Sequence, residues 1–583
     1  MLGAGLAACA APGAAPRQPP ASIAAEPDLG VSNPYGNYLA GRHAQQERDY
    51  AAAADFYTRA LNQDPGNSEL LGRTFLLDLS QGKVADASML ALRVKRADAS
   101  SGMVELVRIV DAAGAGDFAT AEKLSASLSP NGADRFIGPM LSAWARAGMG
   151  HYPGALAALQ PFDQIPGIAP LKDLHVALIA DLAGQTDTAD RAYASVLKAN
   201  PHLSWRLVDL VGNFFERTGR NEDARRLYEH FAAQEQDGDL VAPALARLAS
   251  GQKAAPPPRV ADQMTAPRVA SAADGMAEAL FDLASVLDHG DTQDLALIYA
   301  RLVLHLHPGH VLAQILVGDV LANEHRPEEA LAIDRAIDPA SPFRWAARLR
   351  AVANLQTLGR NDEAIAELKA MSAERPEKEQ PYFLLGDLLR GEDHFAEAAT
   401  AYDQAVARLG ASDPQQWAIF YSRGIALERS NQWPRAEADL LKALELQPDQ
   451  PLVLNYLGYS WVDKGVHLDK ALNMIRRAVE LKPNDGYIVD SLGWAYFRLG
   501  KYVQATQNLE QAAELRPEDP TINDHLGDAY WRTGRVLEAR YQWRRALQFG
   551  PDADEIKTIE GKLSQGLGTA AEQDKPAASA RGG

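Results

Sequence analysis

The sequence contains a single cysteine, Cys9, among its 583 residues. One cysteine cannot form a disulfide within the chain, and it cannot supply the several thiolates of a structural zinc site. Aromatic residues make up only 7% of the chain, while alanine is frequent, and this composition favours closely packed helices over sheets. No apolar run of about 18 residues occurs, so the sequence predicts no helix that spans a bilayer.

Positive charge is also scarce, because 58 lysines and arginines stand against 76 aspartates and glutamates, a formal net charge of −18. This balance disfavours a nucleic-acid partner, since a phosphate backbone requires a basic stripe. Motifs for catalysis and nucleotide binding are absent from the sequence. His305, His307 and His310 lie at a helix end and in a turn, not on one helix face. We therefore expect no enzyme activity, no cofactor, no metal and no small-molecule substrate.

What the sequence does contain is an internal repeat of 34 residues. Gly493, which we call an anchor, follows Leu492 and precedes Tyr496, the turn glycine Gly500, two alanines, a bulky residue and Pro517 at fixed distances. Further anchors recur nearly in phase at Gly527, Gly458, Gly424, Gly386, Val352, Gly318 and Ala284. This spacing is the tetratricopeptide repeat pattern, in which each repeat is a helix hairpin.

The N-terminal part carries about six fainter copies of the repeat. Three have anchors at Gly41, Ala177 and Gly212, and three keep only a turn glycine and an alanine five residues later, at Gly82/Ala87, Gly116/Ala121 and Gly150/Ala155. Small anchor residues let two helices approach closely, and one hairpin cannot bury its apolar face alone, so neighbours stack. The sequence therefore predicts an all-α tetratricopeptide-repeat superhelical solenoid with about 14 repeats in two blocks.

Composition divides the chain into five predicted segments. The segment 251–273 is rich in proline and reads as a linker. It separates a degenerate N-terminal repeat block, 34–250, from a C-terminal block with the full repeat pattern, 274–562. Residues 1–33 read as an Ala/Pro-rich tether behind a signal remnant, and 563–583 as a disordered tail. The alternative is one continuous superhelix with a surface insertion.

The predicted binding surface is the groove lined by the first helix of each C-terminal hairpin. Side chains three residues before an anchor, and one, four and five residues after it, point into this groove. Tyrosine, tryptophan and arginine among carboxylates are typical of a protein interface, and the alternative is that the aromatic rings only pack between helices. The candidate groove residues are Asp387, Arg390, Tyr421, Arg429, Asn455, Tyr459, Asp490, Trp494, Phe497, Arg498, Asp524, Asp528 and Arg532.

Charge at one groove position restricts the kind of partner. Tetratricopeptide clamps for chaperone C-termini use lysine and asparagine to hold carboxylates, whereas Asn455, Asp490 and Asp524 occupy the corresponding position here. An acidic groove repels a terminal carboxylate and suits a basic or mixed-charge protein surface.

The stretch from Asn455 to Pro551, with N-Y-L-G-Y-S-W-V-D-K, D-S-L-G-W-A-Y-F-R-L-G and D-H-L-G-D-A-Y-W-R-T-G in successive repeats, resembles the large tetratricopeptide lipoproteins of Gram-negative outer membranes. That family includes the adaptor of carboxy-terminal processing proteases, which helps them degrade cell-wall hydrolases. The resemblance implies protein partners of these kinds and a scaffold that presents an enzyme to its clients. The alternatives are an assembly or secretion factor for polysaccharide, pili or barrels, and a cytoplasmic adaptor.

The lone cysteine bears on localisation. Leu6-Ala7-Ala8-Cys9 resembles a lipobox, the processing signal of bacterial lipoproteins, and a Pro-rich tether follows it. The charged and apolar regions of a signal peptide are missing before Cys9. We attribute this to a start site placed too late, and the alternative is a chance match to the lipobox. The resemblance implies that Cys9 carries acyl chains and tethers the protein to the periplasmic face of the outer membrane.

Overall fold

The computed structural model describes residues 33–97, 102–129, 131–234, 238–249, 266–410 and 413–568. The regular elements in these ranges are all helices, and none of those helices combines the length and the apolar character that a bilayer crossing requires. Cys9, most of the predicted tether, residues 251–265 of the predicted linker and residues 569–583 of the predicted tail lie outside the described residues.

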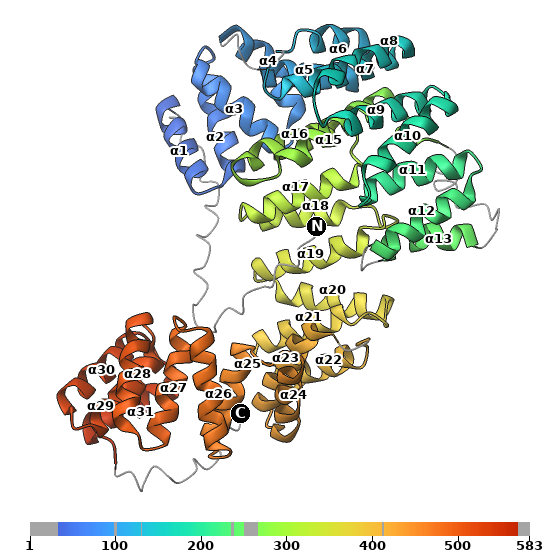
Figure 1. Cartoon of the computed structure of the whole chain (residues 1–583). Coiled ribbons are helices and arrows are strands. Elements are labelled where there is room, and N and C mark those ends of the chain that lie inside the picture. Colours follow the sequence, from blue (N-terminus) through green and yellow to red (C-terminus); the bar gives the residue numbers. More distant parts are fainter. Residues whose placement is uncertain are drawn as a thin grey trace. The chain divides into compact units, whose positions relative to one another are not determined.

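The chain forms two compact units, residues 1–359 and 360–583, shown in Figure 1. The predicted division at 251–273 stays a prediction about the repeats, and it falls inside unit 1. Unit 1 begins with α1 (Pro34–Gln46), α2 (Tyr50–Gln63), α3 (Ser68–Ser80), α4 (Val84–Ala97), α5 (Gly102–Gly114), α6 (Phe118–Ser125), α7 (Asp134–Gly148), α8 (Tyr152–Ala158), η1 (Gln160–Gln164), α9 (Ala169–Leu182), α10 (Thr186–Ala199), α11 (Trp205–Arg217), α12 (Asn221–Gln234), η2 (Gly238–Leu240) and α13 (Ala242–Ala249).

Unit 1 continues beyond the predicted linker with α15 (Ala272–Leu287), η3 (Gly290–Thr292), α16 (Gln293–Leu306), α17 (Val311–Asn323), α18 (Pro327–Ala336) and α19 (Arg344–Thr357). Unit 2 consists of α20 (Asn361–Glu374), α21 (Gln380–Gly391), α22 (Phe395–Val406), η4 (Pro414–Gln416), α23 (Trp417–Arg429), α24 (Trp433–Leu446), α25 (Pro451–Asp463), α26 (Leu468–Leu481), α27 (Gly486–Arg498), α28 (Tyr502–Leu515), α29 (Pro520–Arg532), α30 (Val536–Gln548) and α31 (Ala553–Gln565). The last helix extends into the segment predicted as a tail.

The predicted repeats are helix hairpins held by close packing at the anchor. A Cβ atom on Gly527 would lie 2.5 Å from the Trp543 ring, and one on Gly386 would lie 2.5 Å from the Tyr402 ring. Trp543 and Tyr402 are fully buried, and each stands sixteen residues after its anchor in the facing helix. The anchor is therefore small because the ring of the second helix occupies the space of its side chain.

The turn between the two helices of a hairpin also repeats. Gly82 has φ 76° and Gly500 has φ 72°, the left-handed conformation that glycine adopts without steric cost. At Gly82 the backbone N–H groups of Gly82 and Lys83 donate to Leu79 and Asp78 carbonyls, which closes the end of α3. Positions that keep this conformation without glycine include His325, Asp393 and Asn431.

Unit 1 has an arrangement that the sequence did not predict. The first helices of its hairpins, α3, α5, α7, α9 and α11, form a curved row that we call inner row 1. The hairpin α15–α16 packs against this row, with α15 in contact with α5, α7 and α9, and α16 in contact with α3 and α5. Figure 1 shows the N-terminal helices α1–α13 curving around α15 and α16. The first hairpin after the predicted linker therefore lies inside the N-terminal repeats.

Candidate protein-binding surface

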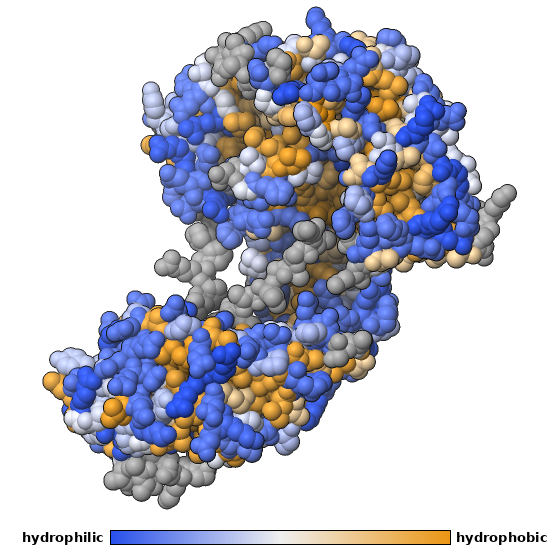
Figure 2. All heavy atoms as spheres, viewed as in Figure 1, coloured by the Kyte–Doolittle hydropathy of each residue, from blue (hydrophilic) through white to orange (hydrophobic). Residues whose placement is uncertain are grey.

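The predicted groove residues lie in unit 2, on the first helices of its hairpins: α21, α23, α25, α27 and α29, which we call inner row 2. Consecutive helices of this row lie side by side: α21 contacts α23, α25 contacts α27, and α27 contacts α29. Figure 2 shows hydrophobic residues on the visible face of unit 2 in patches between hydrophilic ones. Inner row 2 therefore brings together side chains that the sequence separates by about one repeat.

An aromatic stack crosses from α27 to α29. The Trp494 ring lies on the His525 imidazole with 4.0 Å between centroids and 15° between planes, and on Phe497 at 4.8 Å and 9°. Beneath it, the His525 Nδ1 lies 3.0 Å from a carboxylate oxygen of Asp490. Burial opposes the charged imidazolium, but Asp490 outweighs it and the pKa of His525 is raised. Phe497 and Asp490 are buried and Trp494 is half-buried, so the Trp494 indole is more accessible than the Phe497 ring of the stack.

The acidic positions of α29 contact the chain's own C-terminal helix. Lys562 of α31 donates to Asp524 at 2.7 Å and to Asp528 at 2.8 Å, and the Trp543 indole N–H donates to Asp528 at 2.9 Å. Burial raises the pKa of Asp528 to about 6, against the attraction of Lys562. Asp524 and Asp528 are therefore paired with Lys562 inside unit 2, as Asp490 is with His525. An acidic groove at these positions stays a prediction.

At the other end of inner row 2, Asp387 and Arg390 are bound to each other and to a second helix. The Tyr402 hydroxyl donates to Asp387 at 2.6 Å, and the Arg390 Nε donates to the Tyr402 oxygen at 3.2 Å. Arg390 and Asp387 form an ion pair at 3.3 Å. These contacts join α21 to α22 and so stabilise the hairpin.

The exposed arginines and an accessible tyrosine of inner row 2 lie on α23 and α27. Arg429 is exposed and lies over the Phe395 ring at 4.5 Å, and the half-buried Tyr421 meets Tyr456 edge to face. Arg498 is exposed and forms an ion pair with Asp463 of α25 at 3.2 Å.

Three candidates remain half-buried on the same row: Asn455, Tyr459 and Arg532. The Asn455 Oδ1 is buried without a hydrogen-bond partner among the described residues. A buried amide oxygen without a partner costs free energy unless a donor reaches it. Binding at any of these candidate residues stays a prediction.

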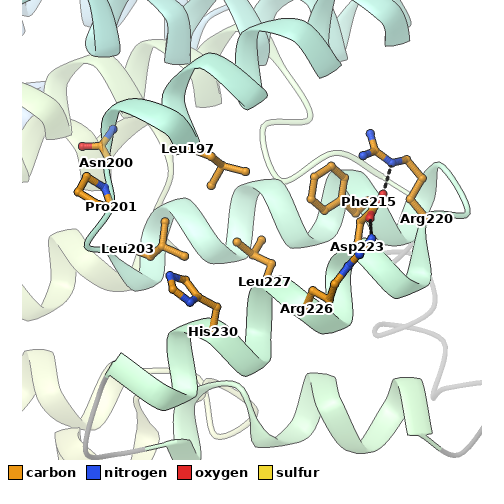
Figure 3. Close-up of a pocket in the computed structure, with 10 residues that line it drawn as sticks. All are labelled: Leu197, Asn200, Pro201, Leu203, Phe215, Arg220, Asp223, Arg226, Leu227 and His230. Carbon is orange, nitrogen blue, oxygen red and sulfur yellow. Dashed lines mark hydrogen bonds and ion pairs between the residues drawn. The ribbon is translucent and has the colours of Figure 1, made fainter.

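A shallow pocket in unit 1 lies away from these predicted residues. It has a volume of about 330 Å³ and is formed by α10, α11 and α12 with the segment between α10 and α11. Figure 3 shows Leu197, Leu203 and Leu227 among the side chains that line it. Arg220, also in the lining, donates to Asp223 at 2.6 Å and lies over Phe215. The sequence carries one signal for this pocket, the spacing of three residues between Arg220 and Asp223. That spacing indicates a helix surface and does not by itself predict a pocket.

Comparison with known proteins agrees with the repeats. Residues 383–451 match the family model described as a tetratricopeptide repeat, and residues 493–534 match a second TPR repeat model. A TPR repeat-containing protein of Pseudomonas aeruginosa is 30% identical over 191 residues, which are 32% of this chain and 32% of that protein. A BBSome complex member of Bos taurus is 32% identical over 112 residues, 19% of this chain and 20% of that protein.

Among solved structures, the chain is similar to one in the crystal structure of the APC/C hetero-tetramer Cut9–Hcn1, with 17% identity, a TM-score of 0.37, and coverage of 93% of this chain and 97% of that chain. The matched segments span less than two thirds of the two curated relatives. The family models and the helix hairpins confirm the predicted fold, an all-α tetratricopeptide-repeat solenoid. The likeness to the lipoprotein adaptor in particular stays a prediction.

Proposed function

We propose that this protein is a non-enzymatic scaffold of the cell envelope that presents a protease or a cell-wall enzyme to its clients. The observation that carries the proposal is the middle of inner row 2, where the half-buried Trp494 and the exposed Arg498 lie one turn apart on α27, and Arg429 is exposed on α23 of the same row. Aromatic and arginine side chains of this kind supply most of the binding energy at protein interfaces. The repeat solenoid supports a role in protein binding.

The binding part of the proposal is tested with full-length protein carrying Arg429→Glu and Arg498→Glu. Crosslinking and capture from envelope extract is expected to recover a protease or cell-wall enzyme with the unchanged protein, and to lose most of it with the double variant. Arg477→Glu and Arg544→Glu form the matched control, because both arginines are exposed on second helices of unit 2, α26 and α30. Equal recovery by the groove variant and the control would remove inner row 2 as the binding surface.

The envelope part of the proposal rests on the lipobox-like residues before Cys9. Mass spectrometry of the protein isolated from its source cells is expected to find an N-terminal peptide that begins at Cys9 and carries acyl chains. Several acyl chains anchor a protein stably where one does not. A native peptide in which Ala8 remains joined to Cys9 would contradict this localisation and favour the cytoplasmic alternative.

A further inference from the structure

Helix α15 is held inside unit 1 by three carboxylates on one of its faces, Asp274, Glu278 and Asp282, which we call the acidic stripe. The three residues are spaced by four and therefore stand above one another on the helix. Each one meets a basic or imidazole side chain from another element of unit 1. The acidic stripe is thus the face of α15 that basic and imidazole side chains contact, and α15 lies against inner row 1.

The centre and the C-terminal end of the stripe contact the N-terminal repeats. The Arg206 Nε of α11 donates to Glu278 at 2.8 Å, and its Nη1 also contacts Asp282. The His175 Nε2 of α9 lies 2.9 Å from the Asp282 Oδ2. Burial opposes ionisation of Asp282, but Arg206 outweighs it and lowers the pKa of this carboxyl. Glu278 and Asp282 are therefore held as charged partners of inner row 1.

Two histidines that follow α16 complete the contacts of the stripe. The His307 Nδ1 lies 2.8 Å from Asp274, and the His310 Nε2 lies 3.2 Å from Glu278. These histidines belong to the same later part of the chain as α15. They therefore contact the stripe from the part of unit 1 that follows α16, whereas Arg206 and His175 contact it from the N-terminal repeats.

Shape complementarity accompanies the charges. A Cβ atom on Gly275 would lie 2.2 Å from the Trp144 ring of α7, so only glycine allows α15 to lie this close to inner row 1. The apolar side chains of α15, among them Met276, Leu280 and Phe281, are buried. Of its residues, Ser285 and Val286 near the C-terminal end are exposed.

From these contacts we propose that inner row 1 is a binding site for an acidic helix and that α15 is its resident ligand, bound in cis. The ligand class is a helix with carboxylates at positions i, i+4 and i+8 and glycine at i+1. While α15 is bound, inner row 1 is closed to other helices, and a partner must either carry the same features and displace α15 or bind elsewhere. This proposal is independent of the partner proposed for inner row 2.

The test uses the full-length protein with a recognition site for a specific protease replacing residues 255–261. After complete cleavage, the two pieces are expected to co-elute at the volume of the uncut protein, and to separate in denaturant. Asp282→Arg and Gly275→Leu are each expected to raise the dissociation rate of the cut pieces at least tenfold, because they leave like charges or a clash at inner row 1. Val286→Arg is the matched control on the same helix and should leave the rate unchanged.

A ligand also has to be distinguished from an element without which the N-terminal repeats do not fold. Hydrogen exchange of the uncut Asp282→Arg protein is expected to show loss of protection in α15 while α10 and α12 stay protected. A synthetic 266–289 peptide should then bind this variant after cleavage, and the same peptide with Asn or Gln in place of the acidic stripe should not. Separation of the cut wild-type pieces, or loss of protection throughout α1–α12, would overturn the proposal.

Discussion

His175 and Asp282 are separated by 107 residues in the sequence, yet the His175 Nε2 lies 2.9 Å from the Asp282 carboxylate. On its other side, the His175 Nδ1 accepts a hydrogen bond from the Trp144 indole N–H at 3.0 Å. A neutral imidazole with its proton on Nε2 satisfies both contacts. His175 is fully buried, so this bridge joins α7, α9 and α15 in the interior of unit 1.

Replacement of His175 with alanine is expected to destabilise unit 1 by about 2–4 kcal/mol, because it opens a cavity and leaves the Trp144 N–H buried without an acceptor. The measurement is thermal unfolding of the full-length protein together with hydrogen exchange in α7, α9 and α15. His202→Ala is the control, since His202 is exposed in the same unit. Equal effects of the two substitutions would show that the bridge contributes nothing to stability.

The C-terminal helix is expected to depend on Lys562. Lys562→Met should destabilise the end of unit 2 by about 3 kcal/mol, because Asp524 and Asp528 would then face each other without a cation. Lys557→Met on the same helix should change stability by less than about 0.5 kcal/mol, since its ion pair with Asp554 is exposed. Hydrogen exchange in α29 and α31 measures both. An unchanged exchange rate in the Lys562 variant would contradict the prediction.

The imidazole of His525 predicts a pH dependence for unit 2. Its pKa in the folded state is raised above 6.5, so the stability that it contributes is complete below pH 6.5 and is lost as the pH rises through the folded pKa. Asp490, Asp524 and Asp528 are the carboxylates that favour its charged form. The melting temperature of unit 2 is expected to fall as the pH rises above 6.5.

The control for this pH dependence is the melting temperature of the His525→Gln variant, measured over the same pH range. This variant keeps a hydrogen-bonding side chain beside Asp490 and has no titration near neutral pH, so its slope above pH 6.5 should be flatter. Asp528, with a pKa raised to about 6, adds loss of stability with rising pH mainly below this window. An identical slope in the variant and the unchanged protein would assign the dependence to other groups.

Two glycines of unit 2 predict effects of opposite sign on substitution with alanine. Gly527→Ala should destabilise by about 1–3 kcal/mol, because its Cβ atom would lie 2.5 Å from the buried Trp543 ring. Gly561→Ala on α31 should stabilise by about 0.5–1 kcal/mol, since no atom lies within 4 Å of its added Cβ and alanine favours the helix. Thermal unfolding measures both, and destabilisation by the second substitution would contradict the helix-propensity argument.

The repeats were predictable because their signals are local. The anchor glycine, the bulky residue sixteen positions later and the turn glycine describe one hairpin, and a hairpin is set by the close approach of two adjacent helices, as at Gly527 and Trp543. The positions on inner row 2 followed from the same phase. Their internal partners did not, since the contact between Asp528 and Lys562 requires the last helix to fold back on α29, which the repeat pattern does not encode.

The sequence by itself determined the helix hairpins and their order, because these depend on spacing within about 34 residues. Only the tertiary structure decided that α15 lies inside the N-terminal repeats and that Asp282 meets His175 and Arg206. The physical reason is that stacked repeats curve, and the curvature of unit 1 brings distant helices around one acidic face. Ion pairs between residues this far apart in the sequence leave no periodic pattern from which they could be predicted.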